Sequence, residues 1–202
     1  PGRERGLVTV SRYDRDNFVI WRTRPTGLQF TLGADARPFD LGNGFPVSAL
    51  EAAPDGMVWL GQILGGLALW SPDGSSRRFG SKETLPHATV LDISQRPNVD
   101  VPEAWVATND GAARVDASGV RATARPLPGP VDAVLALPDG GAWLAFNSLQ
   151  TSLSLGSTQT TRRGPFLQRV TAKGALASPT LPLARGEVLD RAYVGGDRAE
   201  HV

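Results

Sequence analysis

The sequence predicts an all-β fold: a β-propeller segment of about four four-stranded blades plus the start of a fifth. Three observations predict it. The 202 residues include 23 glycines and 16 prolines, which leaves little room for long helices. Four tryptophans recur at spacings of 38, 46 and 38 residues, each within a short apolar run. Asp-Gly and Gly-Gly pairs, which are typical of tight hairpin turns, separate many of these runs.

The tryptophans mark one strand in each successive unit, at Trp21, Trp59, Trp105 and Trp143. In the second and fourth units, an apolar run and a Pro-Asp-Gly turn precede the tryptophan strand. In the third unit a longer loop at 96–103 replaces the turn, which accounts for the spacing of 46. An indole stacked between sheets is large, apolar and able to satisfy its one N–H group. We therefore expect these rings to pack between blades rather than to stack on a ligand.

The units follow one another along the chain, each with four short strands. They cover roughly residues 6–41, 44–81, 87–126 and 130–181, and a partial fifth unit covers 186–202. The fourth unit contains a polar insertion at 148–164, which we expect to project as a loop. Since four and a half blades leave unpaired sheet edges, we expect the remainder of a larger propeller, or a second chain, to complete the ring.

Composition excludes several classes of function. Lys and Arg number 21 against 20 Asp and Glu, so no basic field indicates a nucleic-acid partner. Cysteine is absent, which excludes disulfides and thiolate metal sites. Two histidines are too few for a histidine metal triad. No apolar run reaches the length of a membrane helix and the first residues show no signal-peptide pattern. We expect membrane attachment only through regions outside this chain, and no cofactor.

Residues 44–120 resemble the two-component regulator propeller repeat, a module of extracytoplasmic sensor regions in bacterial hybrid histidine kinases and related receptors. The resemblance rests on Leu85-Pro86 before an inner strand, on the turn at Asp55-Gly56 and on Gly66-Leu67 after a tryptophan strand. It is weaker across 131–180 and faint across 1–40. The resemblance implies a periplasmic or extracellular location. It also implies a sensor that binds a ligand and signals to a membrane partner.

Polar residues follow the tryptophan strands or precede the inner strands. Such positions share one rim of a propeller channel, and a few convergent polar groups are what a ligand pocket needs. We expect a small molecule, a glycan or a protein ligand to bind there. The candidates are Arg24, Gln62, His87, Asn109 and Asn147, with Arg162 and Arg163 on the insertion as a clamp for an anionic ligand.

No residue is assigned a catalytic role. A lone loop histidine such as His87 lacks the positioned partner that general-base catalysis needs. The Asp-Gly pairs are explained as turn residues and do not have the spacing of a calcium loop. Two alternatives to a sensor stay open: an enzyme resembling the streptogramin lyases, which segments 133–135 and 168–174 favour, and a structural scaffold completed by another chain.

Overall fold

The computed structural model describes residues 6–24, 27–42, 44–80, 85–125, 127, 129–148, 153–155, 158–160 and 164–182. All regular secondary structure in this part of the chain is β-strand, and it forms four four-stranded antiparallel sheets and one two-stranded sheet. These sheets confirm the predicted all-β propeller fold. The partial fifth unit at 186–202 lies outside the described residues.

Each sheet is a meander of neighbouring strands, as a propeller blade is. Blade 1 contains β1 (Val8–Arg12), β2 (Phe18–Arg24), β3 (Gly27–Leu32) and β4 (Asp35–Asp40). Blade 2 contains β5 (Val47–Ala52), β6 (Val58–Gln62), β7 (Gly66–Trp70) and β8 (Ser76–Phe79). Blade 3 contains β9 (Val90–Gln95), β10 (Glu103–Thr108), β11 (Gly111–Asp116) and β12 (Gly119–Ala124). Blade 4 contains β13 (Val131–Ala136), β14 (Ala142–Ser148), β17 (Gly164–Val170) and β18 (Leu176–Pro182).

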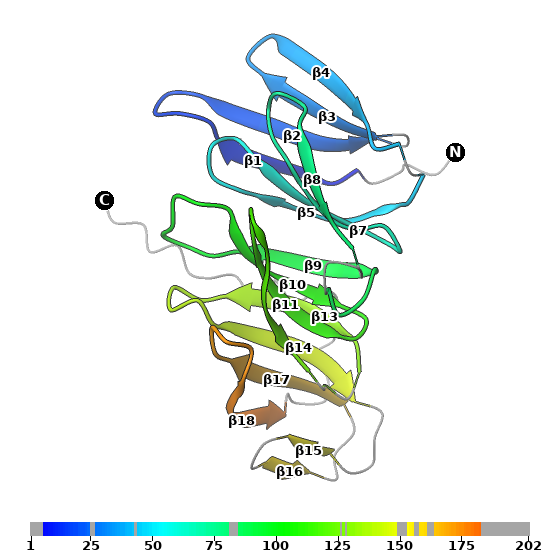
Figure 1. Cartoon of the computed structure of the whole chain (residues 1–202), viewed down its shortest axis with the longest axis vertical. Helices are drawn as coiled ribbons and strands as arrows, with labels where there is room; N and C mark the ends of the chain where they lie inside the picture. Colours follow the sequence, from blue (N-terminus) through cyan, green and yellow to red (C-terminus); the bar gives the residue numbers. More distant parts are fainter. Residues whose placement is uncertain are drawn as a thin grey trace.

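The blades follow one another along the long axis of the molecule (Figure 1). Their first strands lie side by side: β1 beside β5, β5 beside β9, and β9 beside β13. The turn at Asp55-Gly56 shows why Asp-Gly pairs recur between strands. Both residues have positive φ, 57° and 71°, the left-handed conformation that glycine and Asp tolerate best.

Three of the four tryptophans join each blade to the next. Trp21, Trp59 and Trp105 are at most 1% exposed, and each indole N–H reaches a polar acceptor of the following blade. Trp21 Nε1 donates to the Gly56 carbonyl at 2.8 Å, Trp105 Nε1 to the Gly140 carbonyl at 2.9 Å, and Trp59 Nε1 to Gln95 Oε1 at 2.9 Å. The first two acceptors belong to Pro-Asp-Gly turns. Blade 3 has the longer loop instead, and the side chain of Gln95 supplies the acceptor there.

The apolar core lies between the blades, on both faces of each sheet. Alternate residues of a strand point to opposite faces, so Val58 and Leu60 pack toward blade 1 with Trp21, while Trp59 packs toward blade 3 with Ala104 and Val106. In blade 4, Ala142 and Leu144 pack against blade 3. Trp143 lies between them in sequence, on the opposite face, and is only half-buried.

Trp70, the fifth tryptophan of the chain, lies outside the repeat register and is a core residue. It is 5% exposed and its ring lies 5.7 Å from that of Phe39 in blade 1, at an interplanar angle of 31°. Unlike the tryptophans of the register, its Nε1 is buried with no hydrogen-bond partner in the described structure. Packing alone therefore accounts for its position.

The polar insertion of blade 4 differs from the expected loop. It contains a short antiparallel pair, β15 (Leu153–Leu155) with β16 (Thr158–Thr160), inserted between β14 and β17. Alternation of threonine with a polar residue in Thr158–Thr160 favours a strand, because β-branched residues suit extended backbone. Arg162 and Arg163 lie outside the described residues.

The indole hydrogen bond predicts different costs for two buried tryptophans. Trp105→Phe keeps an aromatic ring but leaves the Gly140 carbonyl without its donor, so we expect a loss of about 2–3 kcal/mol in the free energy of unfolding. Trp70→Phe removes an N–H that has no acceptor, so its loss is expected to be smaller by about 1 kcal/mol or more. Urea unfolding followed by circular dichroism measures both, and equal losses would contradict the role assigned to the hydrogen bond.

Candidate functional site

The predicted rim residues have different environments. Their strands are antiparallel, so the ends of β2, β6, β10 and β14 and the segments entering the first strands lie at the same end of the blades. Arg24, Asn109 and Asn147 are exposed there, His87 is half-buried, and Gln62 is 2% exposed. Accessibility alone therefore separates Gln62 from the other candidates.

Gln62 serves the structure of blade 2. It is the last residue of β6, and its Nε2 donates to the Phe45 carbonyl at 2.9 Å. A Cβ added at Gly65 would lie 2.7 Å from Gln62 Oε1 and 2.8 Å from its Cβ. The absence of a side chain at Gly65 thus leaves space for the Gln62 carboxamide, which holds the segment leading into β5.

His87 lies in the segment that connects blade 2 to blade 3, and this segment is tied to both blades. On the blade 2 side, Gly66 N donates to the Ala88 carbonyl at 2.8 Å and Leu64 N to Thr89 Oγ1 at 3.2 Å. On the blade 3 side, Asn109 N donates to the Thr89 carbonyl at 3.4 Å. The segment is thus fixed at several points, and it brings His87 and Asn109 to one part of the rim.

The imidazole of His87 has a defined orientation. Its Nδ1 accepts a hydrogen bond from Thr89 N at 2.9 Å. Because Nδ1 is the acceptor, the neutral ring carries its proton on Nε2. The ring can therefore donate one hydrogen bond to a ligand from Nε2.

Arg125 also holds this segment in place, although it was not among the site residues predicted from the sequence. Arg125 Nη2 donates to the Pro86 carbonyl, and Arg125 Nε donates to the Asp110 carbonyl at 3.0 Å. The guanidinium also pairs with the Asp110 carboxylate at 3.0 Å, and both side chains are substantially exposed. Asp110 was interpreted only as a turn residue, and no local pattern links it to Arg125, which follows β12.

Arg24 and Asn147 lie away from the connecting segment that holds His87. Arg24 ends β2 in blade 1 and Asn147 lies near the end of β14 in blade 4. The Asn147 Nδ2 group donates to Asp132 Oδ2 at 3.0 Å, an exposed contact between β14 and the neighbouring β13. The described structure thus places only His87 and Asn109 of the candidates on one connecting segment and its neighbouring turn.

Polar residues of the first strands form a second set that sequence reasoning missed. Ser48 Oγ donates to the Val90 carbonyl at 2.6 Å, Asp92 Oδ2 accepts from Val134 N at 2.9 Å, and Ser94 Oγ accepts from Ala136 N at 3.0 Å. Each bond joins a first strand to that of the next blade, where no backbone ladder exists. The available signal was a polar residue inside each apolar first-strand run.

Glu51, also on a first strand, is electrostatically distinctive. Burial raises the pKa of its carboxyl to about 7; a hydrogen bond from Gln95 N at 3.3 Å lowers it, and the charge of Asp92 raises it further. The carboxyl therefore changes protonation near neutral pH.

No group of three or more metal-ligating side chains occurs within the described ranges. In the same ranges no helix is long and apolar enough to span a membrane.

No protein-family model and no curated protein matches the sequence. Solved structures do match. The extracellular domain of BT4673 from B. thetaiotaomicron, described as a hybrid two-component system, aligns with a TM-score of 0.50 and 18% identity over 79% of this chain. That of BT3049 aligns with a TM-score of 0.48 and 22% identity over 70% of the chain. BBS1N, solved in complex with ARL6DN, aligns with a TM-score of 0.51 and 15% identity over 89%.

These likenesses concern the fold alone. The chain spans 20% of the BT4673 domain, 21% of the BT3049 domain and 48% of the BBS1N chain. In each case it corresponds to a part of a longer folded chain.

The Glu51 environment predicts a pH dependence of stability. The carboxyl pKa is about 7 in the folded chain against 4.5 for an ordinary glutamate, so the folded state binds this proton more tightly. The contribution of Glu51 to the free energy of unfolding is then fully present below pH 4.5 and is lost as the pH rises through 7. Glu51→Gln removes that loss, and we expect it to gain about 2–3 kcal/mol relative to the unmodified chain between pH 4 and pH 8.

Unfolding by denaturant at a series of pH values measures this gain. The control is Asp100→Asn, which removes an exposed carboxylate with the same change in net charge. Parallel stability curves for Glu51→Gln and the unmodified chain would show that burial does not perturb Glu51.

Proposed function

We propose that this chain is a non-catalytic ligand-recognition module of a bacterial extracytoplasmic signalling protein. The observation that carries the proposal is the connecting segment between blades 2 and 3, which holds His87 beside the turn that contains Asn109. Polar groups held by a rigid scaffold can bind a ligand without the entropic cost of ordering them. The repeat's resemblance to sensor propellers supports the proposal, as does the fold shared with the extracellular domain of BT4673.

The chemistry of His87 favours recognition over catalysis. One ring nitrogen is engaged by Thr89 N, and no carboxylate or hydroxyl of the described residues hydrogen-bonds to the other. A general base needs such a partner to position it and to tune its proton affinity. His87 is better suited to orienting a ligand through one N–H group.

Two residues of the rim supply hydrogen-bond donors at one place. The His87 Nε2 group donates, and the Asn109 carboxamide can both donate and accept. Arg24 lies apart from them, at the end of β2 in blade 1. Such a set favours a ligand rich in oxygen acceptors, for example a glycan or a small carboxylated molecule. The extracytoplasmic location and a membrane-bound signalling partner are part of the same proposal and rest on the repeat resemblance.

A propeller enzyme is the second candidate, and one observation favours it. Glu51 has a pKa of about 7, which is the range suited to a general acid or base. The carboxyl faces the backbone of Gln95 rather than the segment that holds His87. An enzyme would consume the bound molecule, whereas a recognition module would release it unchanged.

Calorimetric titration with neutral and carboxylated hexasaccharides tests the proposal. If a member of this panel binds at the rim, His87→Ala and Asn109→Ala should each weaken it by about tenfold, which corresponds to one lost hydrogen bond of about 1.4 kcal/mol. The control is Asp100→Ala, in the exposed loop at the other end of blade 3. Chromatography of the recovered ligand should show it unchanged.

Two results would count against the proposal. Consumption of the ligand, lost in Glu51→Gln or His87→Ala, would indicate the enzyme. Binding that neither rim variant weakens more than the control does would remove the rim as the site.

A further inference from the structure

A groove lies at the opposite end of the blades from the rim, between the turns of blades 1 and 2. It has a volume of about 290 Å³. Its walls combine an aromatic ring, a thioether and a proline with polar groups of two hairpin turns. The lining residues are Tyr13, Asp55, Met57, Ser71, Pro72 and Asp73.

The groove is built on fixed backbone. The turn glycine, Gly56, donates its N–H to the Arg12 carbonyl at 2.7 Å and accepts the Trp21 indole N–H at 2.8 Å. A Cβ at Gly56 would lie 2.7 Å from Tyr13 Cδ2 and 3.2 Å from Pro72 Cγ. Glycine at this position therefore allows the Tyr13 ring and Pro72 to close over the turn.

Two carboxylates line the groove, those of Asp55 and Asp73. Asp73 Oδ1 accepts hydrogen bonds from Ser75 N at 2.8 Å and Ser75 Oγ at 2.7 Å, and these bonds lower its pKa. Asp73 is therefore ionised at neutral pH, and the side chain of Asp55 is exposed. Neither carboxylate forms an ion pair with any described residue.

The equivalent junction between blades 3 and 4 supplies its own guanidinium groups. There the Pro-Asp-Gly turn contains Asp139, which pairs with Arg169 at 2.7 Å. Arg169 lies opposite Trp143 in the sheet, whereas the residue opposite Trp59 in blade 2 is Leu69. Blade 2 thus has the turn carboxylate, Asp55. Leu69, however, occupies the position at which blade 4 has the arginine that pairs with Asp139.

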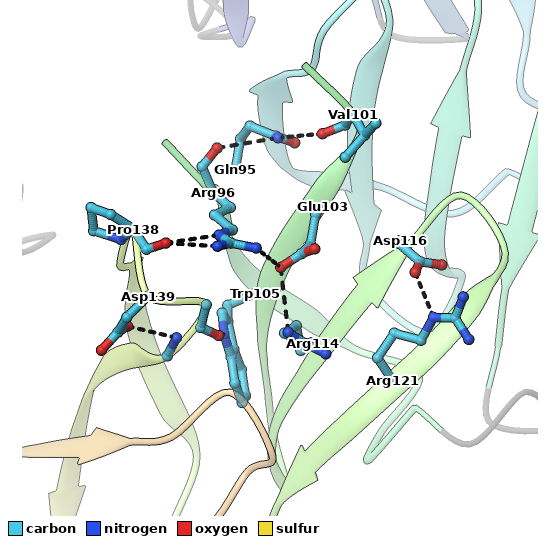
Figure 2. Close-up of polar contacts among 12 residues, drawn as sticks. Gln95, Arg96, Val101, Glu103, Trp105, Arg114, Asp116, Arg121, Pro138 and Asp139 are labelled. Atoms are coloured by element: carbon cyan, nitrogen blue, oxygen red, sulfur yellow. Dashed lines mark hydrogen bonds and ion pairs between the residues drawn. The ribbon is translucent and has the colours of Figure 1, made fainter. Parts of the chain in front are cut away.

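Two more arginines, Arg96 and Arg114, lie at the junction of blades 3 and 4 (Figure 2). The guanidinium of Arg96 donates to the Pro138 carbonyl of the turn, at 2.7 Å from Nη2, and Glu103 lies between Arg96 and Arg114. Around Gly140, the Cβ position lies 3.2 Å from Arg114 Nη1 and 3.7 Å from Arg96 Cζ. At the first junction the Tyr13 ring lies against the turn glycine in place of these guanidinium groups.

We propose that the groove between blades 1 and 2 binds an arginine side chain presented by a partner protein. The planar guanidinium suits the face of Tyr13 through a cation–π contact and the carboxylates of Asp55 and Asp73 through charge-assisted hydrogen bonds. Arginine is preferred to lysine because its flat group stacks on a ring and its fork of donors matches a carboxylate. This site is separate from the rim and from the proposed recognition of a ligand there.

The only methionine of the chain, Met57, lines the groove and provides a unique probe. In protein labelled with ¹³C at the methionine methyl group, titration with acetyl-Gly-Arg-Gly-amide should move a single resonance to saturation. The peptide with citrulline in place of arginine should leave it unmoved, because citrulline has the same shape without the charge. The lysine peptide should bind about threefold or more weakly.

Substitutions at the two carboxylates locate the site. Asn tolerates the positive φ of Asp55, and Asn at position 73 keeps an oxygen acceptor for Ser75, so the double variant Asp55→Asn, Asp73→Asn should fold. It should bind the arginine peptide about tenfold more weakly, and Tyr13→Leu should also weaken binding. Asp100→Asn and Glu103→Gln together change the net charge equally elsewhere and should alter binding by no more than about twofold.

Any of three results would overturn the assignment: no saturable shift of the Met57 methyl resonance, equal binding of the arginine and citrulline peptides, or equal losses in the groove and control variants. Equal binding of the arginine and lysine peptides would overturn the preference for arginine. None of these results bears on the ligand test at the rim, because the two sites lie at opposite ends of the blades.

Discussion

The stacking of successive blades depends on one hydrogen bond, which the indole N–H group of one blade donates to a polar acceptor of the next. A tryptophan buried between two sheets must find an acceptor or leave its N–H unsatisfied in an apolar layer. Trp21 and Trp105 find one in the turn carbonyl of the following blade. That single bond aligns the turn of one sheet with the middle of its neighbour, and so sets the height at which successive blades meet.

Blade 3 shows that the constraint concerns the acceptor rather than the turn. Its loop at 96–103 replaces the Pro-Asp-Gly turn, and the Gln95 side chain accepts the bond from Trp59 instead. Gln95 is itself held, because its Nε2 donates to the Val101 carbonyl at 3.1 Å (Figure 2). A length change in one hairpin is thereby absorbed without disturbing the stack, which leaves the loops free to differ between blades.

The two ends of the blades use this freedom differently. At the rim, the connecting segment with His87 is fixed by hydrogen bonds to both neighbouring blades, which presents neutral donors on a rigid support. At the turn end, the junction of blades 3 and 4 neutralises its carboxylates with its own arginines. At the junction of blades 1 and 2, Asp55 and Asp73 lie beside an aromatic ring and form no ion pair with any described residue. The repeats thus differ from one another at their loops and turns, while the shared residues maintain the scaffold.

The sequence by itself determined the blade count of the described part, the strand that bears each tryptophan and the position of most hairpin turns. These features are local or periodic: φ preferences at Asp55-Gly56 and a matched apolar run around each indole are visible in the chain order. The short strand pair within the insertion escaped it, because three-residue strands carry too weak a pattern. Only the tertiary structure decided that Gln62 is buried, that Arg125 clamps Pro86, and that Glu51 is desolvated enough to raise its pKa to about 7. Those outcomes depend on contacts between residues 15 to 44 positions apart. The order of residues along the chain does not show which distant groups are buried together in a region of low dielectric constant.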